Sequence, residues 1–295
     1  MSQAQPAESG TAARVAAQLE QIALARIEQD RLALPALPAV ATKCLELLRK
    51  NDFSSKKVTD LIETDPILAV RILRTANSAA FGARQPITNI HHAVTHLGAN
   101  KLKTVMMEAA ARPILESRDS RIADATRGLW EHSVAVALLS RDLAVVVGVA
   151  EPEDAYLAGL LHDVGKPVLA MLLLEAENMM ASRSSKEWID STVWVETLQR
   201  SHRNVGVAVA KKWAVPEAAV KAIADCGDYD SGERNSVANL VRFANAVAKK
   251  MGLYVGKTDT DDTETLIMIG RSLLNIEDDQ LARLATGLAD RVRSR

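Results

Sequence analysis

The stretch Ala158-Gly-Leu-Leu-His-Asp-Val-Gly-Lys166 places a histidine–aspartate pair directly after an apolar run and just before a glycine. The apolar run fits a buried helix segment, and the glycine marks a break before the next helix. A His-Asp pair at a helix end sets an imidazole nitrogen and a carboxylate side by side. The stretch therefore predicts a corner between two helices that carries two ionisable groups.

A second inward-facing histidine is predicted upstream. His132 falls on the stripe His132–Val136–Leu139–Leu143, whose spacing places all four side chains on one face of a helix. His132, His162 and Asp163 could then form a three-ligand set of the kind that metal-hydrolysis sites use. The alternative is a buried cluster whose members satisfy one another by hydrogen bonds.

The composition predicts an all-helical protein. The 295 residues include 14 glycines and 9 prolines, alanine is abundant, and aromatic residues make up 3%. Alanine favours helices, glycine and proline disfavour them, and strands favour aromatic and β-branched residues. The hydrophobic content of 48% is enough for a core, in one large domain or two smaller ones.

The charge pattern argues against nucleic-acid and membrane partners. Lys and Arg number 36 against 37 Asp and Glu, so the basic excess of a nucleic-acid binder is missing. No polybasic run, apolar span or secretory leader is evident. Two cysteines, Cys44 and Cys226, make no disulfide framework. We expect a cytoplasmic protein without a cofactor.

Apolar periodicity and capping residues predict the helices. The first ten residues are expected to be disordered, Asp65-Pro66 to open one helix, Thr88 to cap another, and Gly98 to end it. The expected helices cover residues 11–30, 39–49, 55–64, 66–76, 89–97, 100–115, 126–147, 153–161, 166–181, 191–213, 216–224, 237–251, 263–274 and 278–292.

The helix expected at residues 11–30 carries a thin apolar stripe of Val15, Leu19, Ile22 and Ile27. It either packs on its own body or pairs with a second copy, which would make the protein a homodimer. We expect deletion of residues 1–30 to leave a folded helical protein.

Several spaced motifs resemble the HDOD branch of the HD-domain superfamily of metal-dependent phosphohydrolases. The resemblance covers about residues 32–251, beyond the HD pair itself. Its motifs are Leu34-Pro-Ala-Leu-Pro38, Ile62-Glu-Thr-Asp-Pro66, Arg71-Ile-Leu-Arg-Thr-Ala-Asn-Ser78, the pattern within residues 87–98, Glu196 with His202 and Val205-Gly206, and Trp213-Ala-Val-Pro216.

The resemblance implies a multi-helix HDOD fold with an N-terminal helical lobe and a C-terminal HD-like lobe. We assign residues 1–31 to a disordered start and an extra helix, 32–117 to the N-terminal lobe, 118–252 to the HD-like lobe, and 253–295 to helices packing on that lobe. It also implies a role in bacterial signalling, usually without catalysis.

One departure weakens any metal site. An active HD site takes a His, the His-Asp pair and a later Asp, which by position correspond to His132, His162, Asp163 and Asn245. A neutral amide is a poorer ligand for a hard divalent ion than a carboxylate. We therefore expect a vestigial, hydrogen-bonded cluster and no catalysis. Any metal would bind His132, His162 and Asp163.

The sequence thus predicts a stand-alone HDOD regulator that acts by protein–protein interaction. The partner is not identified by the sequence, and the candidate contact residues are Arg74, Asn77, Ser78, Glu196 and His202. One alternative is a metal-dependent phosphohydrolase acting on a nucleotide or a cyclic dinucleotide. Another is a sensor that binds a nucleotide without cleaving it.

Overall fold

The computed structural model describes residues 6–29, 31, 39–48, 54–78, 85–117, 119–149, 151–181, 191–254 and 260–294. These residues form helices joined by turns, with no strand among them, which confirms the all-α fold class. The proline-rich leader at residues 34–38 lies outside this described part of the chain.

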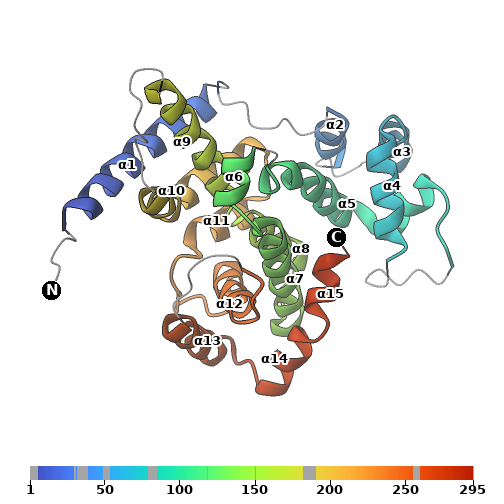
Figure 1. Cartoon of the computed structure of the whole chain (residues 1–295). Helices are drawn as coiled ribbons and strands as arrows, with labels where there is room; N and C mark the ends of the chain where they lie inside the picture. Colours follow the sequence, from blue (N-terminus) through green and yellow to red (C-terminus); the bar gives the residue numbers. More distant parts are fainter. Residues whose placement is uncertain are drawn as a thin grey trace. The chain divides into compact units, whose positions relative to one another are not determined.

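Figure 1 shows the helices along the chain. In chain order they are α1 (Pro6–Glu28), α2 (Ala39–Leu48), α3 (Ser55–Glu63), α4 (Pro66–Ala76), α5 (Ile90–Leu115), α6 (Ser120–Ala125), α7 (Leu129–Val147), α8 (Pro152–Leu161), α9 (Gly165–Ala181), α10 (Ser191–Lys212), α11 (Glu217–Asp225), α12 (Val237–Lys250), α13 (Thr260–Leu274), α14 (Asp278–Ala285) and α15 (Leu288–Arg293).

The chain forms two compact units. Unit 1 is built from both ends of the chain, Met1–Leu34 and Ile114–Arg295, and unit 2 is the intervening stretch Pro35–Pro113. The first helix therefore belongs to the same unit as the His-Asp pair.

Side-chain caps define the short helices of unit 2. Asp65 accepts hydrogen bonds from the backbone N–H groups of Ile67 and Leu68 at 3.1 Å, and Pro66 takes the first helical position, as predicted. Gly98 breaks α5 with φ 70° and ψ 172°, a conformation that glycine adopts at little cost.

The cap predicted at Thr88 is wrong by one residue. Asn89 Oδ1 accepts a hydrogen bond from the backbone N–H of His92 at 2.8 Å, and the Asn89 carbonyl accepts one from Ala93 at 3.2 Å. Asparagine is a stronger N-cap than threonine, so it takes the position when the two are adjacent. His92 and His96 are exposed, as their spacing opposite the apolar stripe predicted.

Helices α7 and α8 form the centre of unit 1, and α12 packs against both. The predicted stripe of α7 from His132 to Leu143 is buried. The approach of α7 and α8 is close because Gly159 lies against the Ala137 backbone, where a Cβ atom would come within 2.8 Å of the Ala137 Cα. Around this centre, α9 packs on α10, α13 on α12, and α14 and α15 on α7.

The single helix expected at residues 278–292 is two helices, α14 and α15. Gly287 lies between them with φ 68°. This left-handed conformation is costly for other residues, so the Thr286-Gly287 pair interrupts a pattern that apolar periodicity alone reads as continuous.

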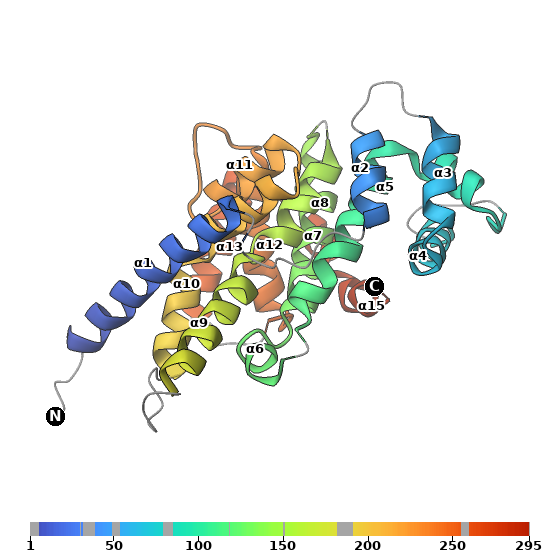
Figure 2. The same ribbon diagram turned by 90° about the horizontal axis from the view of Figure 1, so that it is seen from above.

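Helix α1 begins at Pro6, so residues 6–10 are helical where the sequence predicted a disordered start. It packs along α10 and also contacts α9 (Figures 1 and 2). Its buried stripe is Ala16, Leu19, Ala23 and Ile27, whereas Ile22 is 44% exposed. Leu19 and Ile27 confirm two positions of the predicted stripe, and Ile22 is wrong because the small Ala16 and Ala23 face the neighbouring helices instead. The side chain of Val15 lies outside the described residues.

Polar contacts also fix α1 on its own unit. The Arg26 guanidinium lies 2.5 Å from the Glu175 carboxylate on α9, and Asn204 of α10 donates to Glu20 at 2.6 Å. Ser201 Oγ donates to the Ala16 carbonyl at 3.3 Å.

Deletion of residues 1–30 should therefore destabilise unit 1, contrary to what the sequence alone led us to expect. Removing the buried Leu19 and Ile27 and two buried alanines uncovers apolar surface on α9 and α10 that is worth about 5 kcal/mol. Thermal denaturation of the shortened and full chains measures the loss. An unchanged melting temperature would contradict it, and a shift from dimer to monomer in light scattering would show that α1 also pairs chains.

The sequence led us to expect no segment as long and apolar as a membrane span. One segment does reach that length and hydropathy. Within the described residues, an 18-residue window of the stretch 152–176 reaches a mean hydropathy of 1.5, but 83% of that window is buried inside the protein. Its apolar residues are those of α8 and α9, which protein covers rather than lipid.

Candidate metal centre

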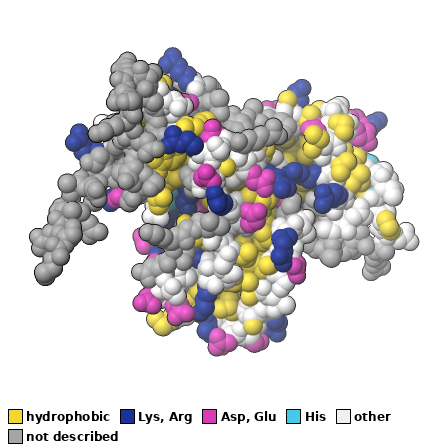
Figure 3. Space-filling view, viewed as in Figure 1, with side chains coloured by type: hydrophobic (Ala, Val, Ile, Leu, Met, Phe, Trp, Pro, Cys, Tyr) yellow, Lys and Arg dark blue, Asp and Glu magenta, His cyan; other side chains and the backbone are white. Residues whose placement is uncertain are grey.

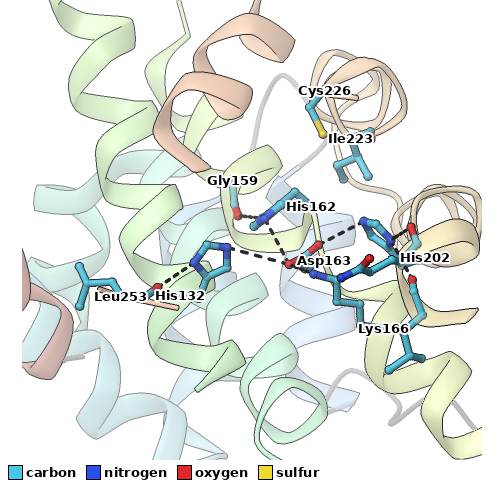
Figure 4. A network of polar contacts seen from close by, with 11 residues as sticks. His132, Gly159, His162, Asp163, Lys166, His202, Ile223, Cys226 and Leu253 are labelled. Carbon is cyan, nitrogen blue, oxygen red and sulfur yellow. Dashed lines mark hydrogen bonds and ion pairs between the residues drawn. The ribbon is translucent and has the colours of Figure 1, made fainter. Parts of the chain in front are cut away.

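Four helices bring ionisable side chains to the carboxylate of Asp163 (Figure 4). His132 comes from α7, His162 and Asp163 follow the last residue of α8, Lys166 lies in the first turn of α9, and His202 belongs to α10. The structure thus brings together the three residues that the sequence placed in one cluster, and it adds Lys166 and His202.

The turn between α8 and α9 positions the group. The Lys166 N–H donates to the Asp163 carbonyl at 2.9 Å, which winds the chain directly into α9. Gly165 then touches the α10 backbone, since a Cβ on Gly165 would overlap the carbonyl oxygen of His202. This glycine lets α9 and α10 approach closely, and the approach sets His202 beside Asp163.

The two oxygens of Asp163 face different partners. Oδ2 lies 2.5 Å from Lys166 Nζ, 3.4 Å from His162 Nε2 and 4.0 Å from His132 Nε2. Oδ1 lies 3.3 Å from His202 Nε2. The side chain of Asp163 is 4% exposed and that of Lys166 is 16% exposed, so this ion pair is largely shielded from water.

Each of the three histidines uses Nδ1 on a backbone carbonyl. The carbonyl partners are Leu253 for His132 at 2.8 Å, Gly159 for His162 at 2.7 Å, and Leu198 and Gln199 for His202 at 2.9 Å. A carbonyl oxygen only accepts hydrogen bonds, so Nδ1 carries the proton. In a neutral ring Nε2 then holds a lone pair, and all three lone pairs are directed at the carboxylate.

Burial keeps these rings neutral. It lowers the pKa of His132 to about 3 and that of His202 to about 4, and it also lowers the pKa of His162. Burial alone would raise the pKa of Asp163, but the cationic ammonium of Lys166, 2.5 Å from Oδ2, outweighs it, and that pKa falls well below its usual range. Asp163 is therefore ionised.

The predicted hydrogen bonds between the histidines and Asp163 are not formed by His132 and His162. Their Nε2 atoms are buried and have no hydrogen-bond partner among the described residues. The reason is that the proton of each ring lies on Nδ1 and is donated to a backbone carbonyl. The Nε2 atom then has only a lone pair, which cannot donate to the Asp163 carboxylate.

This arrangement fits a divalent cation. One ligand atom from each of His132, His162 and Asp163 lies within 4.8 Å of the others, and all three residues are buried. A metal ion would satisfy the two buried Nε2 acceptors, which have no hydrogen-bond donor. Metal-binding histidines also usually donate their other ring N–H to a backbone carbonyl or a carboxylate, as His132 and His162 do here. These three residues would hold the ion.

The segment after α12 closes the centre beside His132. Leu253 supplies the carbonyl to His132, and the Tyr254 ring packs edge-on against the imidazole with centroids 5.0 Å apart. Lys249 Nζ lies 5.1 Å and Lys166 Nζ 5.8 Å from the centroid of Tyr254. Burial lowers the pKa of Lys249.

Asn245 lies on α12, one turn before Lys249 and on the same helix face. Its Oδ1 is buried and has no hydrogen-bond partner within the described chain. Its amide brings no negative charge, and none of the contacts described above joins Asn245 to Asp163 or to the histidines.

The predicted contact residues of unit 2 divide into two kinds. Asn77 bridges the chain, because its Nδ2 donates to Leu73 and Ile87 carbonyls at 2.9 and 2.8 Å and its Oδ1 accepts from the Ile87 N–H at 2.7 Å. Ser78 Oγ donates to Thr75 at 2.8 Å. Both hold the end of α4, whereas Arg74 is exposed.

Of the other two predicted contact residues, only Glu196 reaches the surface. Glu196 pairs with Arg200 one turn later on α10, at 2.6 Å. His202 is 7% exposed and faces Asp163, so its assignment to an interaction surface is wrong. Sequence spacing could not reveal this, because the approach of α10 to Asp163 is a tertiary contact made at Gly165.

Comparisons with known proteins agree with this architecture. The family model of the HDOD domain matches residues 34–228. Among solved structures, a protein from Shewanella amazonensis SB2B, provisionally named a metal-dependent phosphohydrolase, is 21% identical with a TM-score of 0.70, over 95% of this chain and 99% of that chain.

Two further structures share the fold. An HDOD domain protein of unknown function from Geobacter sulfurreducens is 24% identical with a TM-score of 0.62, over 92% of this chain and 95% of that one. A protein from Marinobacter aquaeolei VT8, provisionally named for signal transduction, is 21% identical with a TM-score of 0.56, over 94% and 66%. No curated protein matches. Because the family model spans well over half of the sequence, this chain belongs to the HDOD domain family.

Proposed function

We propose that this HDOD protein is a cytoplasmic regulator that acts by binding a protein partner and does not hydrolyse a phosphoester. The observation that carries the proposal is the state of the Asp163 carboxylate, which is buried and already paired with Lys166 at 2.5 Å. A catalytic metal site keeps a coordination position open to water or substrate. Here His132 is 0% exposed, and His162 and Asp163 are each 3% exposed.

The charge of the centre supports the same proposal. Lys166 balances the charge of Asp163, and Asn245 adds none. A two-metal hydrolytic site needs several carboxylates or comparable ligands to hold its ions and the reacting phosphate. The related protein from Marinobacter aquaeolei VT8, provisionally named for signal transduction, is in keeping with a regulatory role.

Helix α4 offers a surface for such a partner. Ile67 is 79% exposed and Val70 is 57% exposed, and Arg74 follows one turn later on the same face. Exposed apolar side chains next to a cation fit a partner segment that carries apolar and acidic residues. We propose this α4 face, residues 67, 70 and 74, as the contact with the partner.

The purified protein should show no phosphodiesterase activity. With added Mn²⁺, bis(p-nitrophenyl) phosphate and a cyclic dinucleotide should remain intact, because the carboxylate that would hold the ion is paired with Lys166. Product formation is followed by absorbance and by chromatography. Turnover that disappears in His162→Ala would overturn the non-catalytic proposal.

Charge introduced on α4 should abolish partner binding without unfolding the protein. A partner is first identified by copurification from native lysate, and its affinity for Val70→Glu and Arg74→Glu is then measured with purified proteins. Both changes should weaken binding at least about tenfold. Met268→Glu on α13, at another exposed apolar residue, is the matched control. Equal affinities for all variants would exclude this face.

A metal-dependent phosphohydrolase is the second candidate function. The buried, unpartnered Nε2 atoms of His132 and His162 favour it, as does the provisional name of the protein from Shewanella amazonensis. A bound divalent ion would polarise a phosphoryl oxygen and lower the pKa of a bound water. In this chain the histidines and Asp163 would hold the ion, while Leu253 and Gly159 orient the two imidazoles.

A further inference from the structure

Lys166 occupies the side of Asp163 on which a metal ion would bind. Its ammonium lies 2.5 Å from Oδ2, the oxygen that also faces His162 and His132 at 3.4 and 4.0 Å. The other oxygen, Oδ1, faces His202 instead. Figure 4 shows Lys166, His132 and His162 directed at Asp163, with Lys166 on α9, His132 on α7 and His162 next to Asp163 in the chain.

The lysine satisfies the carboxylate but not the two imidazoles. The Nε2 atoms of His132 and His162 have no hydrogen-bond partner in the described structure, so the ammonium does not donate to them. A divalent ion held by His132, His162 and Asp163 Oδ2 would share that oxygen with the Lys166 ammonium, and two cations on one oxygen repel each other strongly.

Lys166 also has a place to which it can withdraw. It lies in the first turn of α9, its side chain is 16% exposed, and its ammonium is already 5.8 Å from the Tyr254 ring centroid. A lysine stem has enough rotatable bonds to exchange an ion pair with a carboxylate for a position over an aromatic face or in water.

We propose that Lys166 is an internal cation that competes with a divalent metal ion for Asp163 Oδ2. The metal affinity of the centre is set by the lysine: the paired form has a closed, neutral centre, and metal binds only when Lys166 leaves. This inference shares the Lys166–Asp163 pair with the proposed function, but it concerns metal binding and requires neither a partner nor hydrolysis.

The test is a Mn²⁺ titration of the full-length protein, with free Mn²⁺ measured by electron paramagnetic resonance. Lys166→Met keeps the length of the side chain and removes the charge, so it should bind one Mn²⁺ about tenfold or more tightly than the wild type. Lys221→Met is the control, because that lysine is 64% exposed and pairs with Glu233 instead of Asp163. It should leave the affinity unchanged.

The substitution His162→Ala is also made in the wild type and in Lys166→Met. It measures the metal that binds outside the centre, such as on the exposed His92 and His96. The gain in Lys166→Met should vanish with it. Equal Mn²⁺ affinity of wild type and Lys166→Met, or a gain that survives His162→Ala, would overturn the proposal. Hydrolysis and partner binding are not measured, so failure here leaves the proposed function to its own assays.

A measurement on the wild type keeps the proposal testable if Lys166→Met does not fold. Lysines are acetylated with acetic anhydride with and without saturating Mn²⁺, and each site is quantified by mass spectrometry. Release from Asp163 should increase the labelling of Lys166 with metal bound, while the labelling of the exposed Lys221 stays constant. Unchanged labelling of Lys166 with Mn²⁺ bound would overturn the proposal.

Discussion

Gly165→Ala is expected to destabilise unit 1 by about 3 kcal/mol or more, at the upper end of overpacking effects. A Cβ atom there would overlap the His202 carbonyl oxygen and come within 2.8 Å of the Gly206 nitrogen, so the clash is with backbone that cannot rotate away. Relief requires α9 and α10 to separate, and that movement also withdraws His202 from Asp163. Chemical denaturation monitored by circular dichroism measures the loss.

Gly206→Ala is the matched control on the facing helix. A Cβ on Gly206 would meet its nearest neighbours at 3.6 Å, an ordinary contact distance. Alanine is also favoured over glycine within a helix by up to about 1 kcal/mol. Gly206→Ala should therefore be neutral or stabilising. If Gly165→Ala is as stable as Gly206→Ala, α9 and α10 are not as close as described.

Asp163→Ala should lower the stability of unit 1 by about 1–3 kcal/mol, the usual cost of removing one partner of a buried hydrogen-bonded pair. The change leaves the Lys166 ammonium without its ion-pair partner, and the side chain must shift toward Tyr254 or water. For a unit of this size the loss corresponds to a fall in melting temperature on the order of 5 °C. Thermal denaturation in the presence of a chelator measures the effect, so that loss of metal does not contribute.

Asp290→Ala provides the control for Asp163→Ala. Asp290 also pairs with a basic residue, Arg293 at 2.7 Å, but its side chain is 83% exposed. Exposed pairs contribute at most about 1 kcal/mol, so its melting temperature should stay close to that of the wild type. If Asp163→Ala melts like Asp290→Ala, the centre is accessible to water, and the second candidate function gains support.

The helices could be predicted because their signals are local. Asp65-Pro66 and Gly98 act within one turn of the chain, and the stripe from His132 to Leu143 needs only helical periodicity. Gly287 shows the limit of that reasoning. Apolar spacing continues across it, whereas the extended backbone of Thr286 and the left-handed backbone of Gly287 divide α14 from α15.

The candidate site could be predicted in part. His162 and Asp163 are adjacent in sequence, and the inward face of α7 identified His132. The role of Lys166 was open to sequence reasoning, because a lysine three residues after an aspartate at a helix start can reach back to it. His202 was not, since its contact with Asp163 depends on where α10 packs, and no local pattern encodes that.

The position of α1 at the start of the chain has a consequence for synthesis. Ser201 contacts Ala16 across 185 residues, so α1 emerges from the ribosome long before α10 exists. At about 5–20 residues per second, this interval lasts roughly 10–40 s. During that time the stripe of Leu19, Ala23 and Ile27 has no docking surface on its own chain. Chaperones and other nascent chains can reach it throughout that interval, and unit 1 closes only after translation has passed α10.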